Sequence, residues 1–132
     1  MKTKPWLSLE DARRIAAAAE AEAQSHNWPV VIAICDDGGH LILLHRIDGV
    51  APISSTIAPA KARAAALGKR ETKLYEEMIN QGRAAFLSAP LEGMLEGGVP
   101  ILADGHVVGG IGVSGVKASE DAQIAKAGVA AL

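Results

Sequence analysis

The chain has 132 residues, of which 49% are hydrophobic, 21% charged and 3% aromatic, with a formal net charge of -2. This length fits one domain over residues 1–132, and the charge and aromatic content argue against a nucleic-acid partner. No stretch approaches about 20 continuous apolar residues and no apolar leader follows the N-terminal lysines, so we expect a cytoplasmic protein without a membrane partner.

In chain order, the first part of the sequence predicts a helix and a β-hairpin. A helix over 9–25 follows Ser8, which can cap it together with Asp11 three residues later. The β-branched run 30–35 is apolar at both parities, which is typical of a central strand covered on both faces. After an Asp-Asp-Gly-Gly turn, 41–47 is expected to return antiparallel to it.

The middle of the chain predicts two helices. The alanine-dense segment 54–67 is a strong helix former with a narrow face that can lie close to a sheet. A second helix over 72–80 would place Leu74 and Met78 on one side, with Tyr75 as a further candidate for that side. We also expect one short strand within the glycine-punctuated stretch 86–95.

The last third predicts a second hairpin and a final helix. The strands 99–103 and 106–115 flank an Asp-Gly turn, and Ser119 is expected to cap the helix that follows. The whole order describes a mainly antiparallel sheet sandwiched by helices, an α/β (α+β) fold.

One face of the strand 106–115 is almost bare. Strict alternation places Gly110, Gly112 and Ser114 on the same side. Something must approach the backbone closely there, and the thin helix around 58–66 is the matching partner. A ligand floor or a subunit contact is the alternative.

Three stretches together resemble the GlcG and HbpS-like (haem-degrading, DUF336) family. They are DDGGHLILLHRIDGVAPISS from Asp36, IAPAKARAAALG from Ile57 and GGVPILADGHVVGGIGVSGVKASEDAQIAKAG from Gly97. The resemblance covers about Ser8 to Gly128. It implies a profilin-like α-β-α sandwich around a five-stranded antiparallel sheet, usually in a homo-oligomer.

The resemblance implies binding of haem, a related tetrapyrrole or another carboxylate-bearing small ligand. The family includes haem-binding proteins, a sensor-kinase partner, a glycolate-operon product and the C-terminal domain of PduO-type adenosyltransferases. Haem is therefore the expected cofactor, although the sequence has no Cys-x-x-Cys-His motif. The alternatives are a cofactorless lyase or isomerase acting on a small organic acid, and a regulatory or assembly partner that docks through its glycine face.

Charged residues supply the candidate ligand contacts. Arg46 and Asp48 are two apart on one expected strand, so they could pair or present the guanidinium to a carboxylate ligand. Lys61, in the family's Lys-Ala helix motif, is either a buried acid, base or anion clamp or an exposed lysine. In the enzyme alternative, Lys61 or Glu96 moves a proton.

Backbone groups and one histidine complete the candidate site. Gly97 and Gly98 offer flexible amides beside Glu96, and Ser114 lies in a turn that could present amides to an anion. His45, in mid-strand, is the best-placed haem ligand among the histidines, although a core histidine is the competing interpretation. The single cysteine, Cys35, is expected to be a small core residue.

Overall fold

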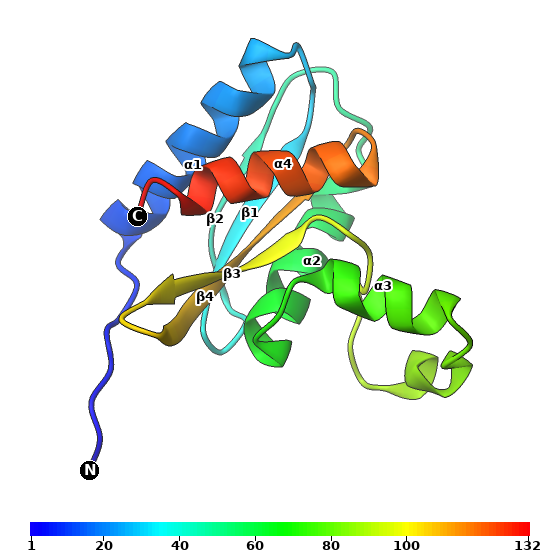
Figure 1. The fold of residues 1–132 in the computed structure, drawn as a ribbon. Helices are drawn as coiled ribbons and strands as arrows, with labels where there is room; N and C mark the ends of the chain where they lie inside the picture. The colour runs from blue at the N-terminus through cyan, green and yellow to red at the C-terminus, as the bar shows by residue number, and fades with distance from the viewer.

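The computed structural model describes all 132 residues, and its elements follow the expected order except in one segment (Figure 1). The helices are α1 (Leu9–Ser25), α2 (Ser54–Gly68), α3 (Thr72–Asn80) and α4 (Ala118–Val129), with a 3-10 helix, η1, at Ala84–Ser88. The strands are β1 (Val31–Asp36), β2 (Leu41–Arg46), β3 (Gly98–Ala103) and β4 (His106–Ser114). None of the helices combines the length and apolar character needed to cross a membrane.

The four strands form one antiparallel sheet in the order β2-β1-β4-β3. Both predicted hairpins are confirmed, and the central pair joins β1 to β4, with Val31 opposite Ser114 and Cys35 opposite Gly110. The α+β class is therefore confirmed, but the expected fifth strand is wrong. Pro90 lacks an amide donor and Gly93 has a φ of +73°, so the chain between η1 and β3 does not run as a strand.

Helices cover both faces of the sheet, as Figure 1 shows. On one face α1 and α4 pack over the larger apolar cluster, whose fully buried members include Ile15, Ile32, Ile111 and Ile124. On the other face α2 packs over a smaller cluster of small side chains, including Ala33 and Ala58. The two faces thus differ in thickness, and the thin one carries the helix that matters for the site.

Helix α2 packs directly on the glycine face of β4, the side that carries Gly110 and Gly112. A Cβ on Gly112 would lie 2.5 Å from the amide nitrogen of Ala62 and closer still to the carbonyl oxygen of Ala58. A Cβ on Gly110 would collide with the carbonyl oxygen of Ala62. Helix packing, the first interpretation of this face, is confirmed. Because α2 covers this face, neither a ligand nor a partner protein can contact it.

Two local expectations are wrong. Helix α3 buries Tyr75, as the sequence allowed, but its other buried residue is Thr72, while Leu74 is 49% exposed. Thr72 is drawn inward because its hydroxyl accepts a hydrogen bond from the Gly98 amide. Ser119 is exposed and does not cap α4, because the Glu120 carboxylate accepts the Lys117 amide at 3.2 Å and Asp121 accepts that of Val116.

Candidate ligand-binding site

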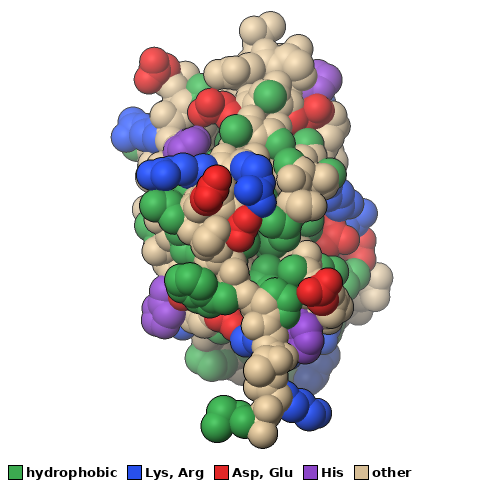
Figure 2. Space-filling model, turned by 90° about the vertical axis from the view of Figure 1, so that its left-hand side faces the viewer, with side chains coloured by type: hydrophobic (Ala, Val, Ile, Leu, Met, Phe, Trp, Pro, Cys, Tyr) green, Lys and Arg blue, Asp and Glu red, His purple; other side chains and the backbone are tan.

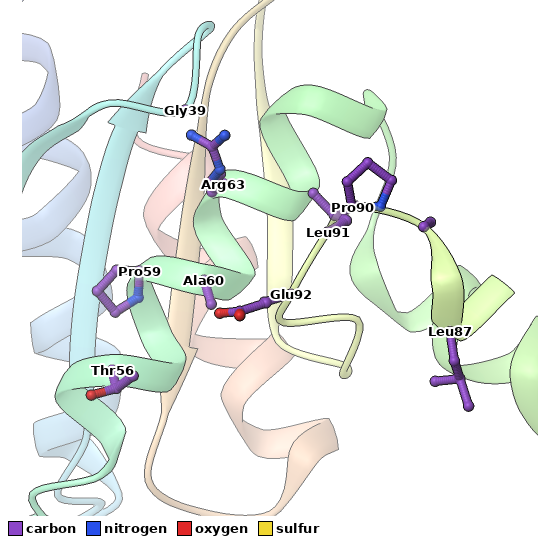
Figure 3. Close-up of a pocket in the computed structure, with 10 residues that line it drawn as sticks. Gly39, Thr56, Pro59, Ala60, Arg63, Leu87, Pro90, Leu91 and Glu92 are labelled. Carbon is purple, nitrogen blue, oxygen red and sulfur yellow. The ribbon is translucent and has the colours of Figure 1, made fainter.

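The largest cavity in the protein, about 650 Å³, lies between the outer side of α2 and the chain from Leu87 to Glu92. We call it the α2 cavity. Figure 3 shows its two walls, with Thr56, Pro59 and Arg63 on the helix and Leu91 and Glu92 on the opposing segment. Its volume falls in the range of roughly 300–1,000 Å³ that is usual for small-molecule sites.

The helical wall follows from the spacing of residues on α2. Thr56, Pro59, Ala60 and Arg63 line the cavity and recur at helical spacing. They lie opposite the alanine face that α2 presses onto β4. Because the alanine face is held against strand backbone, the outer wall of the cavity is held with it.

The opposing wall is positioned by a glycine. Gly93 adopts a φ of +73°, and a Cβ there would lie 2.5 Å from the Lys61 amide nitrogen. Only glycine allows the segment to press onto the helix backbone at this point. As a result the neighbouring Leu91 and Glu92 are brought against α2. The same two side chains, with Leu87, also border a second cavity of about 340 Å³ on the α3 side.

The α2 cavity holds one cationic and one anionic side chain, and neither has a partner. Arg63 and Glu92 are both exposed and make no ion pair or side-chain hydrogen bond. Arg63 packs beside the turn at Gly39, where a Cβ would lie 2.9 Å from its Cγ. Its five N–H donors are free, and a guanidinium of this kind suits a carboxylate or phosphate.

The protein's own side chains form no metal-binding cluster. The structure contains no group of three or more His, Cys, Asp or Glu side chains placed to hold a metal ion. The α2 cavity is lined by no histidine, cysteine, methionine or tyrosine. A ligand there would be held by apolar contacts and by Arg63, Glu92 and Thr56.

Lys61, one of the two cations expected from the sequence to meet a ligand, is buried and already paired. Its ammonium donates to the Val113 carbonyl oxygen at 2.9 Å and to Asp121 Oδ2 at 3.1 Å. Burial raises the pKa of Asp121, while the neighbouring Lys61 charge acts in the opposite direction. The pair ties α2 to β4 and α4. Lys61 lines none of the cavities, and the exposed-lysine interpretation is wrong.

The glycines near Lys61 serve packing in this structure. Gly97 and Gly98 are buried, and a Cβ on Gly97 would lie 2.8 Å from the Lys61 ammonium nitrogen. Ser114 is 6% exposed and its hydroxyl donates to Ser54 Oγ at 3.2 Å. Glu96 is partly buried and, like these residues, lines no cavity. The structure therefore does not bring the predicted rim residues to an open site.

Arg46 and Asp48 do not share a strand. β2 ends at Arg46, and the chain then turns, with Ile47 donating its amide to the Val30 carbonyl oxygen and Gly49 at a φ of +92°. Both charged side chains are exposed and they form no ion pair with each other. Asp48 borders a separate cavity of about 340 Å³.

His45 and Cys35 also lie away from the α2 cavity. His45 is opposite Ile32, whose side chain belongs to the α1 face, and its Nδ1 lies 3.5 Å from Glu20 Oε1 on α1. The histidine is thus on the face of the sheet opposite to α2. Cys35 is 2% exposed, and burial raises the pKa of its thiol to about 11, which agrees with a core role.

Sequence reasoning missed the residues that line the α2 cavity. The signal was present on the helix, since the outward positions 56, 59, 60 and 63 combine a threonine, a proline and an arginine at helical spacing. The other wall gave no local signal. It depends on the contact between Gly93 and α2, which joins segments about 30 residues apart.

Comparison with known proteins gives consistent matches over nearly the whole chain. Residues 7–130 match the family described as haem degrading protein HbpS-like. Protein GlcG of Escherichia coli (strain K12) is 58% identical over 114 residues, which cover 86% of this chain and 85% of GlcG. The crystal structure of a PduOC:haem complex has a TM-score of 0.88 and 32% identity, covering 97% of this chain and 96% of that one. The crystal structure of HbpS has a TM-score of 0.89 and 32% identity, covering 100% and 94%.

Proposed function

This chain belongs to the HbpS-like family of haem-degrading proteins, and from that premise we propose that it binds haem or a related tetrapyrrole in the α2 cavity. The proposal rests on the composition of the largest cavity, which combines apolar side chains with the guanidinium of Arg63. That guanidinium has no ion-pair partner in the protein. The similarity to a protein crystallised with haem supports the choice of ligand.

The residues present fit such a ligand. A tetrapyrrole of the haem type is a broad apolar ring with carboxylate side chains, so it needs an apolar slot and a cation at its edge. Pro59, Leu87 and Leu91 provide apolar contacts, and Arg63 can donate two parallel N–H groups to a ligand carboxylate. When bound, haem would supply a redox-active iron whose properties depend on its ligands and on the polarity around it.

We further propose that the protein acts as a homo-oligomer. Large apolar side chains remain exposed, among them Leu87, which lines the α2 cavity, and Ile53, which immediately precedes α2, both at 65% exposure. Figure 2 shows the other side of the molecule, the left of Figure 1 with α1 and the N-terminal segment, where charged side chains of both signs are interspersed with apolar ones. A second copy of the chain could bury the exposed apolar side chains of the cavity side.

The two alternatives receive less support from the geometry. An enzyme that moves a proton with Lys61 or Glu96 would need one of them in an open site, and neither lines a cavity. A partner that docks through the glycine face would have to displace α2. The organic-acid enzyme stays a prediction without an observation in its favour.

Titration with ferric haem, followed by visible absorbance, tests the proposal. We expect a saturable Soret shift that weakens about tenfold in Arg63→Gln, because the ligand carboxylate loses a charged hydrogen-bond partner. Arg46→Gln is the matched control, since Arg46 is also exposed and free of ion pairs but lies on the edge strand. Its affinity should equal that of the wild type.

Three other results would lead elsewhere. The absence of a saturable shift in the wild type would reject haem as the ligand. Equal binding by wild type and Arg63→Gln, with loss in Arg46→Gln, would move the site to the edge strand. Loss in His45→Ala would place the ligand on the α1 face and make His45 the iron ligand.

A further inference from the structure

We propose that Glu92 makes the α2 cavity select metal-bearing tetrapyrroles over metal-free ones. Its carboxylate would face the positively charged centre of the ligand while Arg63 holds a ligand carboxylate. This inference rests on the proposed function, because it assigns a selectivity to the same cavity.

The position of Glu92 follows from the contact between its neighbour and α2. Gly93 touches the helix backbone at Ala60 and Lys61, which places the adjacent Glu92 against the outer side of the helix, where it lines the cavity. Figure 3 shows its carboxylate next to Ala60, turned toward the space between the two walls. Arg63 stands one helical turn further along α2, beside Gly39.

The charge of Glu92 is available to a ligand. It is the only anionic side chain that lines the α2 cavity, and it forms no ion pair with Arg63 or with any other cation. A ligand can therefore contact both charges favourably only if it has an anionic edge for Arg63 and a cationic centre for Glu92. A ligand with an anionic edge alone would leave Glu92 facing a neutral or negative group.

A trivalent metalloporphyrin has this distribution of charge. Its metal-filled core carries one positive charge, whereas the core of the metal-free ring is neutral, and both carry the same peripheral carboxylates. The cavity has no histidine, cysteine, methionine or tyrosine to serve as a metal ligand, so a carboxylate oxygen is the strongest donor present. Glu92 thus adds attraction for one ring and none for the other.

Fluorescence titration with gallium(III) protoporphyrin and metal-free protoporphyrin tests the inference, since both rings fluoresce and gallium has no redox chemistry here. For the wild type we expect the gallium ring to bind about tenfold more tightly. Glu92→Gln should abolish this preference and leave the affinity for the metal-free ring unchanged or higher. Glu10→Gln, an exposed carboxylate on the first turn of α1, should keep the preference and controls for net charge.

The outcomes separate this inference from the proposed function. If both rings bind and Glu92→Gln retains the preference, or if the wild type shows none, the role of Glu92 is refuted while the cavity stands. If neither ring binds the wild type, the proposed function falls and the selectivity falls with it.

Discussion

Substitution of Gly112 by alanine should destabilise the protein by forcing α2 away from β4. The added methyl group would meet backbone atoms, the Ala58 carbonyl oxygen and the Ala62 amide nitrogen, the latter at 2.5 Å. Backbone of a regular helix cannot turn aside as a flexible side chain can. The collision is therefore relieved only by moving the helix or bending the strand.

The magnitude follows from two opposing effects. Overpacking of a well-packed core costs about 1–3 kcal/mol and occasionally more, and a clash with helix backbone belongs at the upper end. Removal of glycine restricts the unfolded chain and returns about 0.4–1 kcal/mol, because the φ of Gly112 is not positive. We expect a net loss of about 2 kcal/mol, or a melting temperature lower by about 8 °C.

Urea unfolding of wild type, Gly112→Ala and Gly38→Ala checks this estimate. Gly38 is the matched control, because its φ is also not positive and its closest neighbour is the exposed side chain of His40 at 3.1 Å. Its substitution should change the free energy of unfolding by less than about 0.5 kcal/mol. If Gly112→Ala also changes the free energy of unfolding by less than this margin, the close packing of α2 on β4 is refuted.

Three further predictions concern the ion pair, the thiol and the helix caps. Lys61→Met should lower the free energy of unfolding by about 3–5 kcal/mol, because it leaves the Asp121 carboxylate buried without a counter-charge. The double variant that also carries Asp121→Asn should recover part of this loss. If urea unfolding shows that the losses of the two single variants add in the double variant, the pairing is contradicted. Burial raises the pKa of the Cys35 thiol to about 11 from an ordinary value near 9, so the native state holds the proton more tightly than the unfolded state. The free energy of unfolding should therefore fall by up to about 3 kcal/mol as pH rises from 9 to 11. Cys35→Ala should lack this fall, and equal pH profiles of stability for the variant and the wild type would disprove the prediction. Ser8→Ala should cost about 1 kcal/mol, since Ser8 Oγ accepts the Asp11 amide, whereas Ser119→Ala should be neutral in thermal unfolding.

Local periodicity accounted for most elements of this fold. The helices over 9–25 and 72–80 have the bounds expected from the sequence, and both hairpins follow from their Asp-Gly turns. The failures arose where a distant segment decides. Helix α3 turns Thr72 inward and leaves Leu74 exposed, because the Thr72 hydroxyl accepts the Gly98 amide and the Tyr75 hydroxyl occupies the space beside Gly68. Neither contact is visible in a helical pattern.

The candidate site was harder to predict for the same reason. The charge on Lys61 looked available because its helix is otherwise alanine, yet its partner Asp121 lies 60 residues further along the chain. Arg63, two residues later, faces the opposite way and lines the cavity. A shift of two positions on a helix reverses the direction of a side chain, so burial could be assigned only after the sheet was in place.

The pairing of β1 with β4 sets the order in which this chain can fold during synthesis. Paired residues on the two central strands lie more than 70 positions apart in the sequence, and β4 also forms the surface on which α2 packs. On the ribosome, β1 and α2 emerge long before the strand that both require. We expect the emerging N-terminal half to hold only local helices and its hairpin, and native assembly to start once Ser114 has left the exit tunnel.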